Sequence, residues 1–219
     1  MKVLCISDEI DPLIYSPNAK ERLRDIDFVI SAGDLPMEYL GFICSMTCTP
    51  LYFVFGNHNL KYLKQFNKSN QNNPFRISSE IHSQNTFGAN YINKRCIRHE
   101  DLLITGLGGC KKYNHGKNQF TEWQMLFRML SLLPRLFINK LLYGRFVDIF
   151  VTHAPPRGIN DRDDPCHQGF VCFRWFIKLF QPRYMMHGHV HLYEDPNKRK
   201  TIWENCEVIN VFQSHTMHL

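Results

Sequence analysis

Short apolar runs that end in polar groups recur along the N-terminal part of the chain. Three of these runs are rich in β-branched and aromatic residues and predict strands, at 2–7, 27–31 and 50–55. Two stretches between them have helical spacing, at 19–24 and 36–45. Strands that alternate with helices indicate βαβ units, and therefore an α/β fold with a parallel sheet.

The pattern continues through the rest of the chain without a repeat or a clear boundary. Strands are expected at 148–152, 199–204 and 206–212, with two short strands inside 91–105. Helices are expected over 170–180 and, in two pieces separated at Pro134, over 120–142. The polar stretch 67–73 predicts an exposed loop. We expect a single domain, 1–219.

The segment 120–142 is both very apolar and basic, and two interpretations stay open. It can form a helical lobe that covers the core of the domain. Alternatively, it can form a helix that lies on a membrane surface or in the groove of a partner protein.

Composition limits the class of protein. The 219 residues are 44% apolar and 21% charged, which is ordinary for a globular chain. We find no apolar run of about 18 residues, so no transmembrane segment is expected, and the first apolar run is too short for a secretion signal. The eight cysteines contain no CxxC pair, which favours a reduced, cytoplasmic protein.

The formal charge of +6 favours anionic partners: phosphate esters, nucleic acid or acidic membranes. The basic residues form no stripe with interleaved aromatic residues, so nucleic acid is possible but not favoured. The oligomeric state stays open.

Polar residues of ligand type follow the predicted strands. They are Asp8, Asp34, Asn57, His58 and His153. Because ligands bind beyond the carboxyl ends of strands in a parallel sheet, these side chains are expected to share one site.

The sequence Gly188-His189-Val190-His191 has the character of a strand, which would place both imidazoles on one face. Their spacing would allow each ring to serve one ion of a pair roughly 3.5–4 Å apart. The alternative is two histidines on the solvent-exposed face of an edge strand. Carboxylate, amide and imidazole groups together suit Zn, Mn or Fe better than Ca.

The order of these motifs resembles the calcineurin-like metallophosphoesterase family, whose motifs run D-x-H, G-D, G-N-H-D/E, H and G-H-x-H. The matching residues are Asp8-Glu9-Ile10, Gly33-Asp34, Gly56-Asn57-His58-Asn59, His153 and Gly188-His189-Val190-His191. The resemblance covers residues 3–212. It implies a β-sandwich flanked by helices, with two divalent metal ions (Mn, Zn or Fe) at one end of the sheets.

The same resemblance implies roles for individual residues. Asp34 would bridge the ions, with Asp8 and His191 on the first ion. The second ion would be held by Asn57, His153 and His189. His58 would contact the phosphate and protonate the leaving oxygen, while a metal-bound hydroxide hydrolyses a phosphodiester or a small phosphomonoester.

Two positions depart from the family pattern. Ile10 replaces a histidine and cannot bind a metal, so we predict a first site that is weak or empty. Asn59 replaces an acidic residue that helps to orient the histidine before it, so His58 is expected to be a weaker acid. These departures motivate an alternative function, a binding or scaffold protein that keeps the fold and the metal site but is catalytically weakened.

Two loops supply candidates for binding substrate. Tyr113 and Asn114 follow a glycine-rich break, and Arg157 and His167 lie in the loop after His153. The guanidinium of Arg157 can bind a phosphate through two hydrogen bonds, or can pair with the aspartates nearby.

Overall fold

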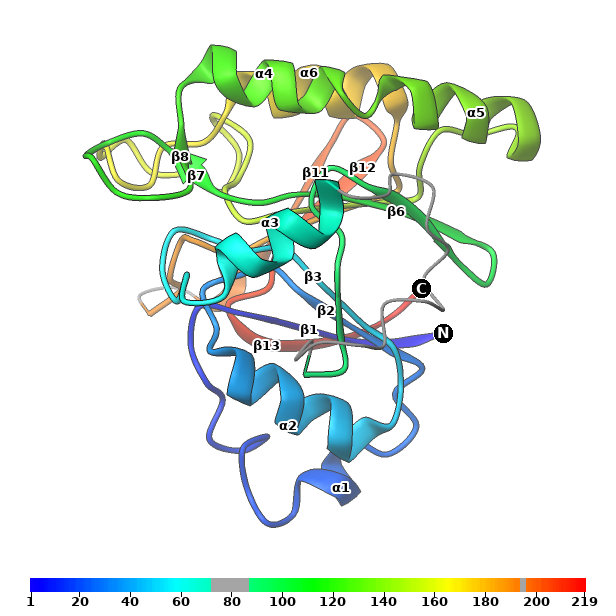
Figure 1. The fold of residues 1–219 in the computed structure, drawn as a ribbon, viewed down its shortest axis with the longest axis vertical. Coiled ribbons are helices and arrows are strands. Elements are labelled where there is room, and N and C mark those ends of the chain that lie inside the picture. Colours follow the sequence, from blue (N-terminus) through cyan, green and yellow to red (C-terminus); the bar gives the residue numbers. More distant parts are fainter. Residues whose placement is uncertain (72–86, 194–195) are drawn as a thin grey trace.

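Two β-sheets form the centre of the molecule in the computed structural model, which describes residues 1–71, 87–193 and 196–219 (Figure 1). The first sheet has the strand order β13-β1-β2-β3-β4. Its strands are β1 (Lys2–Ser7), β2 (Phe28–Ser31), β3 (Leu51–Phe53), β4 (Ala89–Tyr91) and β13 (Gln213–His218). The strands β1 to β4 pair in parallel, as the alternating pattern predicts, and β13 is antiparallel to β1.

The second sheet has the order β11-β12-β10-β9-β6-β5. Its strands are β5 (Cys96–His99), β6 (Leu102–Leu107), β9 (Ile149–Thr152), β10 (Tyr184–His187), β11 (Lys200–Trp203) and β12 (Cys206–Asn210). A small separate ladder joins β7 (Cys110–Lys111) to β8 (Gln119–Phe120). The strands β6, β9, β10 and β12 are parallel, so their carboxyl ends lie at one edge.

The two sheets pack face to face and enclose a central apolar core. Val3 and Ile30 from the first sheet share this core with Ile104, Val151 and Met186 from the second. Their alternate neighbours point outward, where helices cover them. The fold is therefore a mixed α/β sandwich flanked by helices, as expected.

Helices cover the outer face of each sheet. The first sheet is covered by α1 (Ala19–Arg22), α2 (Met37–Thr47) and α3 (Leu63–Gln71). The second sheet is covered by α4 (Glu122–Leu130), α5 (Leu133–Tyr143) and α6 (Val171–Phe180), which form one layer at the top of Figure 1. The predicted break near Pro134 is confirmed, since the proline lies in the first turn of α5.

Two sequence predictions differ from the structure, and one strand was not predicted. Residues 67–71 of the expected loop belong to α3, and 72–73 lie outside the described residues. The polar strand β13 was not predicted, because its residues lack an apolar alternation. The run Gly188–His191 is not a strand, since β10 ends at His187.

No helix in the described part of the chain is long and apolar enough to cross a membrane.

Candidate metal centre

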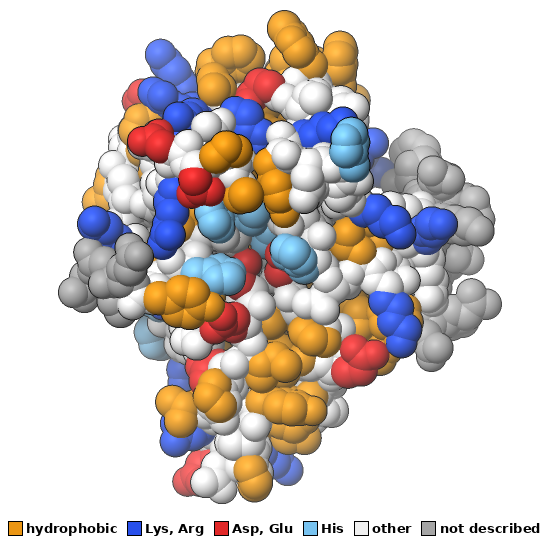
Figure 2. All heavy atoms as spheres, turned by 90° about the vertical axis from the view of Figure 1, so that its left-hand side faces the viewer, with side chains coloured by type: hydrophobic (Ala, Val, Ile, Leu, Met, Phe, Trp, Pro, Cys, Tyr) orange, Lys and Arg blue, Asp and Glu red, His pale blue; other side chains and the backbone are white. Residues whose placement is uncertain are grey.

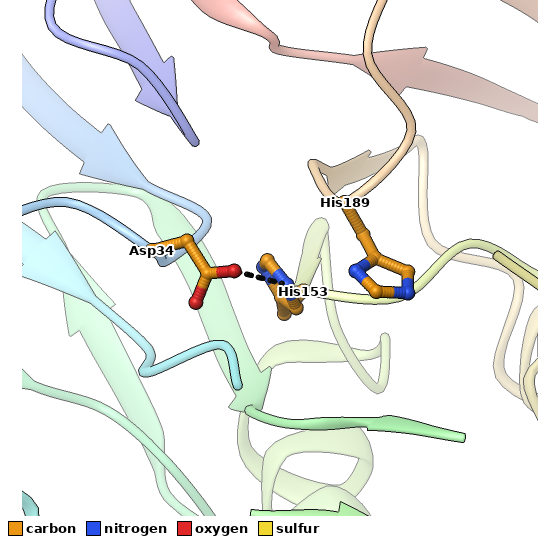
Figure 3. Close-up of side chains that lie close together, drawn as sticks. All are labelled: Asp34, His153 and His189. Atoms are coloured by element: carbon orange, nitrogen blue, oxygen red, sulfur yellow. Dashed lines mark ion pairs between the residues drawn. The ribbon is translucent and has the colours of Figure 1, made fainter. Parts of the chain in front are cut away.

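Ligand-type side chains from both sheets meet at the carboxyl ends of the parallel strands. Asp34 follows β2, His153 follows β9 and His189 follows β10. One ligand atom from each of the three lies within 4.8 Å of the other two, and all three residues are buried. Figure 3 shows the His153 ring between Asp34 and His189, and Figure 2 shows histidine and acidic side chains gathered in the middle of this face.

Backbone carbonyls fix the two imidazole rings. His153 donates from Nδ1 to the Ala32 carbonyl oxygen at 2.8 Å, and His189 donates from Nε2 to the Cys166 carbonyl oxygen at 2.7 Å. Because a carbonyl oxygen only accepts, the ring nitrogen that faces it carries the proton. Nε2 of His153 and Nδ1 of His189 are thus the nitrogens left to bind a metal, in the arrangement typical of metal-ligating histidines.

Asn57 adds a fourth candidate ligand. Its Oδ1 lies 3.1 Å from His153 Nε2, and Asp34 Oδ2 lies 3.2 Å from the same nitrogen. The Asn57 amide donates from Nδ2 to the Tyr113 hydroxyl at 3.4 Å, which turns the amide oxygen toward the cluster. One carboxylate, one amide oxygen and two imidazoles are a donor set that fits a Zn, Mn or Fe class ion.

The charges of Asp34 and His153 are strongly linked. Burial lowers the pKa of His153, but the negative charge and hydrogen bond of Asp34 outweigh it and raise this pKa to about 9. Burial raises the pKa of Asp34, but the His153 ring and the His58 backbone N–H bring it down to about 2. Near neutral pH, a proton on His153 therefore supplies the positive charge that a metal ion would supply.

His189 behaves in the opposite way. Burial, and secondly the charge on His153, lower the pKa of His189 to about 3. The ring is neutral near pH 7, which is the form that binds metals.

Two glycines allow these groups to approach one another. A Cβ on Gly56 would collide with Asp34 Oδ1, and a Cβ on Gly188 would collide with Asp8 Oδ2. Any other residue at either position would displace a carboxylate. The glycines of the G-N-H and G-H-x-H motifs thus follow from the packing of the site.

The groups expected on a first ion are arranged differently. The backbone N–H of His189 donates to both carboxylate oxygens of Asp8, at 2.9 and 3.0 Å, and burial raises the pKa of Asp8. The His191 ring stacks on Phe212, with centroids 4.9 Å apart. The side chain of Ile10 is 38% exposed and offers no ligand. Among the described residues, no second trio of His, Cys and carboxylate groups lies within ligand distance. The residues present therefore fit one ion well and a second ion poorly.

The backbone explains why the two histidines of the last motif separate. His189 has a φ of 67°, in the left-handed region, immediately after β10 ends. A left-handed residue turns the chain out of the strand direction, so the expectation of two rings on one strand face is wrong.

His58 and Asn59 follow directly after Asn57. The backbone N–H of His58 donates to Asp34 Oδ1 at 2.7 Å, and its side chain is exposed. Asn59 donates from Nδ2 to the Asp34 carbonyl oxygen, also at 2.7 Å. This segment therefore holds Asp34 in place through two hydrogen bonds and leaves the His58 ring open to solvent.

The four substrate candidates have different surroundings. Tyr113 contacts Asn57, as above, and the His167 ring centroid is 5.4 Å from that of His189. Arg157 is paired with Asp161 and Asp163 at 2.8 and 3.1 Å, as the alternative interpretation expects.

The remaining candidate, Asn114, is engaged inside its own loop. Its Oδ1 accepts from Gly116 N and Gln119 Nε2, both at 2.7 Å. Of the four candidates, Tyr113 and His167 are thus the two that contact the cluster.

Sequence reasoning missed two supporting residues. His187 is fully buried, with Nδ1 3.0 Å from the Gly188 carbonyl oxygen, and burial lowers its pKa to about 4. Asn118 donates to the carbonyl oxygens of Phe55 and Gly56 and so ties its loop to the third motif. The signal for His187 was its place at the end of an apolar strand, directly before the glycine of the last motif.

Comparisons with known proteins agree with this architecture. The calcineurin-like phosphoesterase family model matches residues 1–193. No curated protein sequence matches. One crystal structure superposes with a TM-score of 0.62 at 17% identity, covering 97% of this chain and 90% of its own. TT1561 of Thermus thermophilus superposes with a TM-score of 0.58 at 13% identity, covering 96% of this chain and 88% of its own. The family match spans most of the sequence, and the chain belongs to the calcineurin-like phosphoesterase family.

Proposed function

We propose that this protein hydrolyses a phosphodiester or a small phosphomonoester, using an ion held by Asp34, Asn57, His153 and His189. Family membership implies metal-dependent hydrolysis of phosphoesters in general. One observation carries the assignment to these residues. Each imidazole has one nitrogen tied to a backbone carbonyl, which leaves its other nitrogen facing the cluster. On His189, whose pKa is lowered to about 3, this nitrogen carries no proton near pH 7; on His153, whose pKa is raised to about 9, an incoming ion would replace the proton.

When bound, such an ion places positive charge against the phosphoryl oxygens and makes water more acidic. The protein supplies the remaining functions. His58 is exposed beside Asp34, where its ring can contact a phosphate and protonate the leaving oxygen. Tyr113 holds the Asn57 amide in the orientation that presents its oxygen.

We propose further that the protein holds one ion tightly and a second only weakly. The weak position is that of Asp8 and His191, where the usual histidine is Ile10. Support comes from the engagement of the Asp8 carboxylate by the His189 backbone and from the stacking of His191 on Phe212.

The test is a metal-reconstituted assay on bis-(p-nitrophenyl) phosphate and p-nitrophenyl phosphate, with the metal content counted in parallel. We expect turnover with at least one of Mn, Zn, Fe or Ni. Absence of turnover with all four, in protein that has bound metal, would contradict the enzyme assignment.

Ile10 and Asn59 favour a second candidate function, a phosphate-ester binding protein that has lost efficient chemistry. Asn59 contacts the Asp34 backbone, where an acidic residue is usual in the family. The two functions separate in one experiment, because a binding protein would bind the diester in metal-loaded form without turning it over. Binding can be followed by calorimetry on the same samples as the assay.

A further inference from the structure

The helical layer that covers the second sheet carries an unusual amount of exposed apolar surface. Large exposed side chains on α4, α5 and α6 are Trp123, Phe127, Leu130, Phe137, Ile138, Leu141, Leu142, Tyr143, Trp175 and Leu179. We call this set the outer apolar face. Leu141 is 85% exposed and Trp123 is 70% exposed. An apolar surface of this extent is uncommon on a protein that contacts only water.

The outer apolar face is separate from the side of the helices that packs on the sheet. Met125, Met129 and Leu136 are buried against the second sheet. Trp123 and Phe127, four residues apart, lie together on the exposed side of α4. A surface helix normally has one apolar stripe and a polar opposite side. The helices α4 and α5 are apolar on both sides, so packing of the core does not explain the outer residues.

Basic residues accompany the outer apolar face. Residues 122–145 and 171–183 contain seven lysines and arginines: Arg128, Arg135, Lys140, Arg145, Arg174, Lys178 and Arg183. Glu122 is the only acidic residue in these two segments. Their net charge of +6 equals that of the whole chain, so the remainder of the sequence is formally neutral. Arg145 is paired to Asp148, and Arg128 is turned inward, where it donates to Asn93 Oδ1. The layer therefore keeps five exposed basic residues, which are Arg135, Lys140, Arg174, Lys178 and Arg183.

We propose that the outer apolar face docks on the surface of a lipid bilayer that contains anionic lipids. Aromatic side chains such as Trp123 and Trp175 favour the interface between headgroups and acyl chains. Lysine and arginine side chains can lay their apolar stems along this region while their charges reach anionic headgroups. The 11 residues of α5 extend about 16 Å, roughly half the hydrocarbon thickness, so the layer lies along the bilayer.

A second copy of the chain is a poorer occupant of the same face. In a two-fold dimer each patch would contact its own equivalent, which would bring the two basic layers together. The carboxylate of Glu122 is not available for an ion pair with a basic residue of the second copy, because its Oε1 accepts from the Cys172 backbone N–H and its Oε2 is buried. A bilayer with anionic lipids supplies opposite charge over the whole face.

Flotation with lipid vesicles tests the proposal. We expect the full chain to float with vesicles of phosphatidylcholine and phosphatidylglycerol, but not with phosphatidylcholine alone, and to bind less as salt is raised. Arg174→Gln combined with Lys178→Gln should weaken binding about fivefold for each charge. Phe127→Ser combined with Leu141→Ser should weaken it at least about tenfold.

The matched control is Leu13→Ser, which removes a 60% exposed leucine outside the outer apolar face, next to Ile14 in the core under the other sheet, and should leave flotation unchanged. Thermal unfolding of each variant checks that the fold persists.

Failure of the wild-type chain to float with anionic vesicles would overturn the proposal. Equal flotation of wild type and Phe127→Ser/Leu141→Ser would also overturn it. The proposal would also be overturned if light scattering showed a stable dimer that does not bind vesicles and that dissociates in Phe127→Ser/Leu141→Ser. None of these readouts depends on phosphoesterase turnover.

Discussion

The two halves of the metal centre contain similar residue types but are built differently. In one half, which we call the firm half, backbone carbonyls orient the rings of His153 and His189, and the carboxylate of Asp34 faces them. In the other half, which we call the incomplete half, the carboxylate of Asp8 accepts from the His189 backbone, and the ring of His191 stacks on Phe212. The comparison teaches that a ligand motif supplies residue types, whereas ligation depends on what orients each side chain.

The sharpest test compares the two histidines of one motif. We expect His189→Ala to abolish metal binding in the firm half. Turnover should fall by more than the 10–100-fold that is typical when the hydrogen-bond partner of a metal ligand is removed. His191→Ala should retain one ion per chain. Metal content and diester turnover, measured on both variants, give the result. Equal losses in the two variants would show that the halves are equivalent.

The next largest effect concerns His58, which borders the firm half. His58→Ala should lower kcat about 100-fold, the usual contribution of a general acid, without loss of the ion. The comparison of kcat with metal content separates proton transfer from binding. Unchanged turnover would remove His58 from the chemistry.

The firm half should bind metal in a pH-dependent way. The pKa of His153 is raised to about 9, so below that pH an incoming ion must displace a proton. The pKa of His189 is lowered to about 3, so that ring releases none near pH 7. Affinity should therefore rise roughly tenfold per pH unit from about pH 6 and level off above about pH 9.

Calorimetry in buffers of different ionisation enthalpy measures the same quantity directly. We expect release of about one proton per ion near pH 7. An affinity that stays constant over this pH range would contradict the protonated state of His153.

The smallest effect is expected from repair of the incomplete half. Ile10→His should raise the metal content from one ion per chain toward two, with a change in turnover below about tenfold, because His191 must also leave Phe212. Ile10→Leu is the matched control and should leave the metal content at one. A single ion in Ile10→His would mean that orientation, rather than ligand type, limits this half.

Sequence reasoning predicts the features that arise locally. The positions of Asp34, Asn57 and His153 follow from strands that end where an apolar run ends, and parallel pairing brings those ends to one edge. Features that depend on distant backbone groups leave no such signal. The carbonyl that orients His153 belongs to Ala32, 121 residues earlier, and any residue type could supply it.

The last motif is a second case in which a distant contact leaves no signal in the local sequence. The alternation of Gly188-His189-Val190-His191 is compatible with a strand, but His189 adopts a left-handed conformation, with its backbone N–H bound to Asp8, which lies 181 residues earlier. Strand β13 escaped prediction because its pairing with β1, rather than its own composition, defines it.

The proposed ligands of the firm half come from both sheets, with Asp34 and Asn57 from the first and His153 and His189 from the second. A bound ion would therefore connect the two sheets of the sandwich, and its binding free energy would add to the free energy of global unfolding. At a free metal concentration 1,000 times Kd, the added stability is about 4 kcal/mol. For a chain of this size, that amounts to a rise in Tm of roughly 8–16 °C. Thermal melting in the presence of candidate metals would thus rank their affinities before any substrate is known.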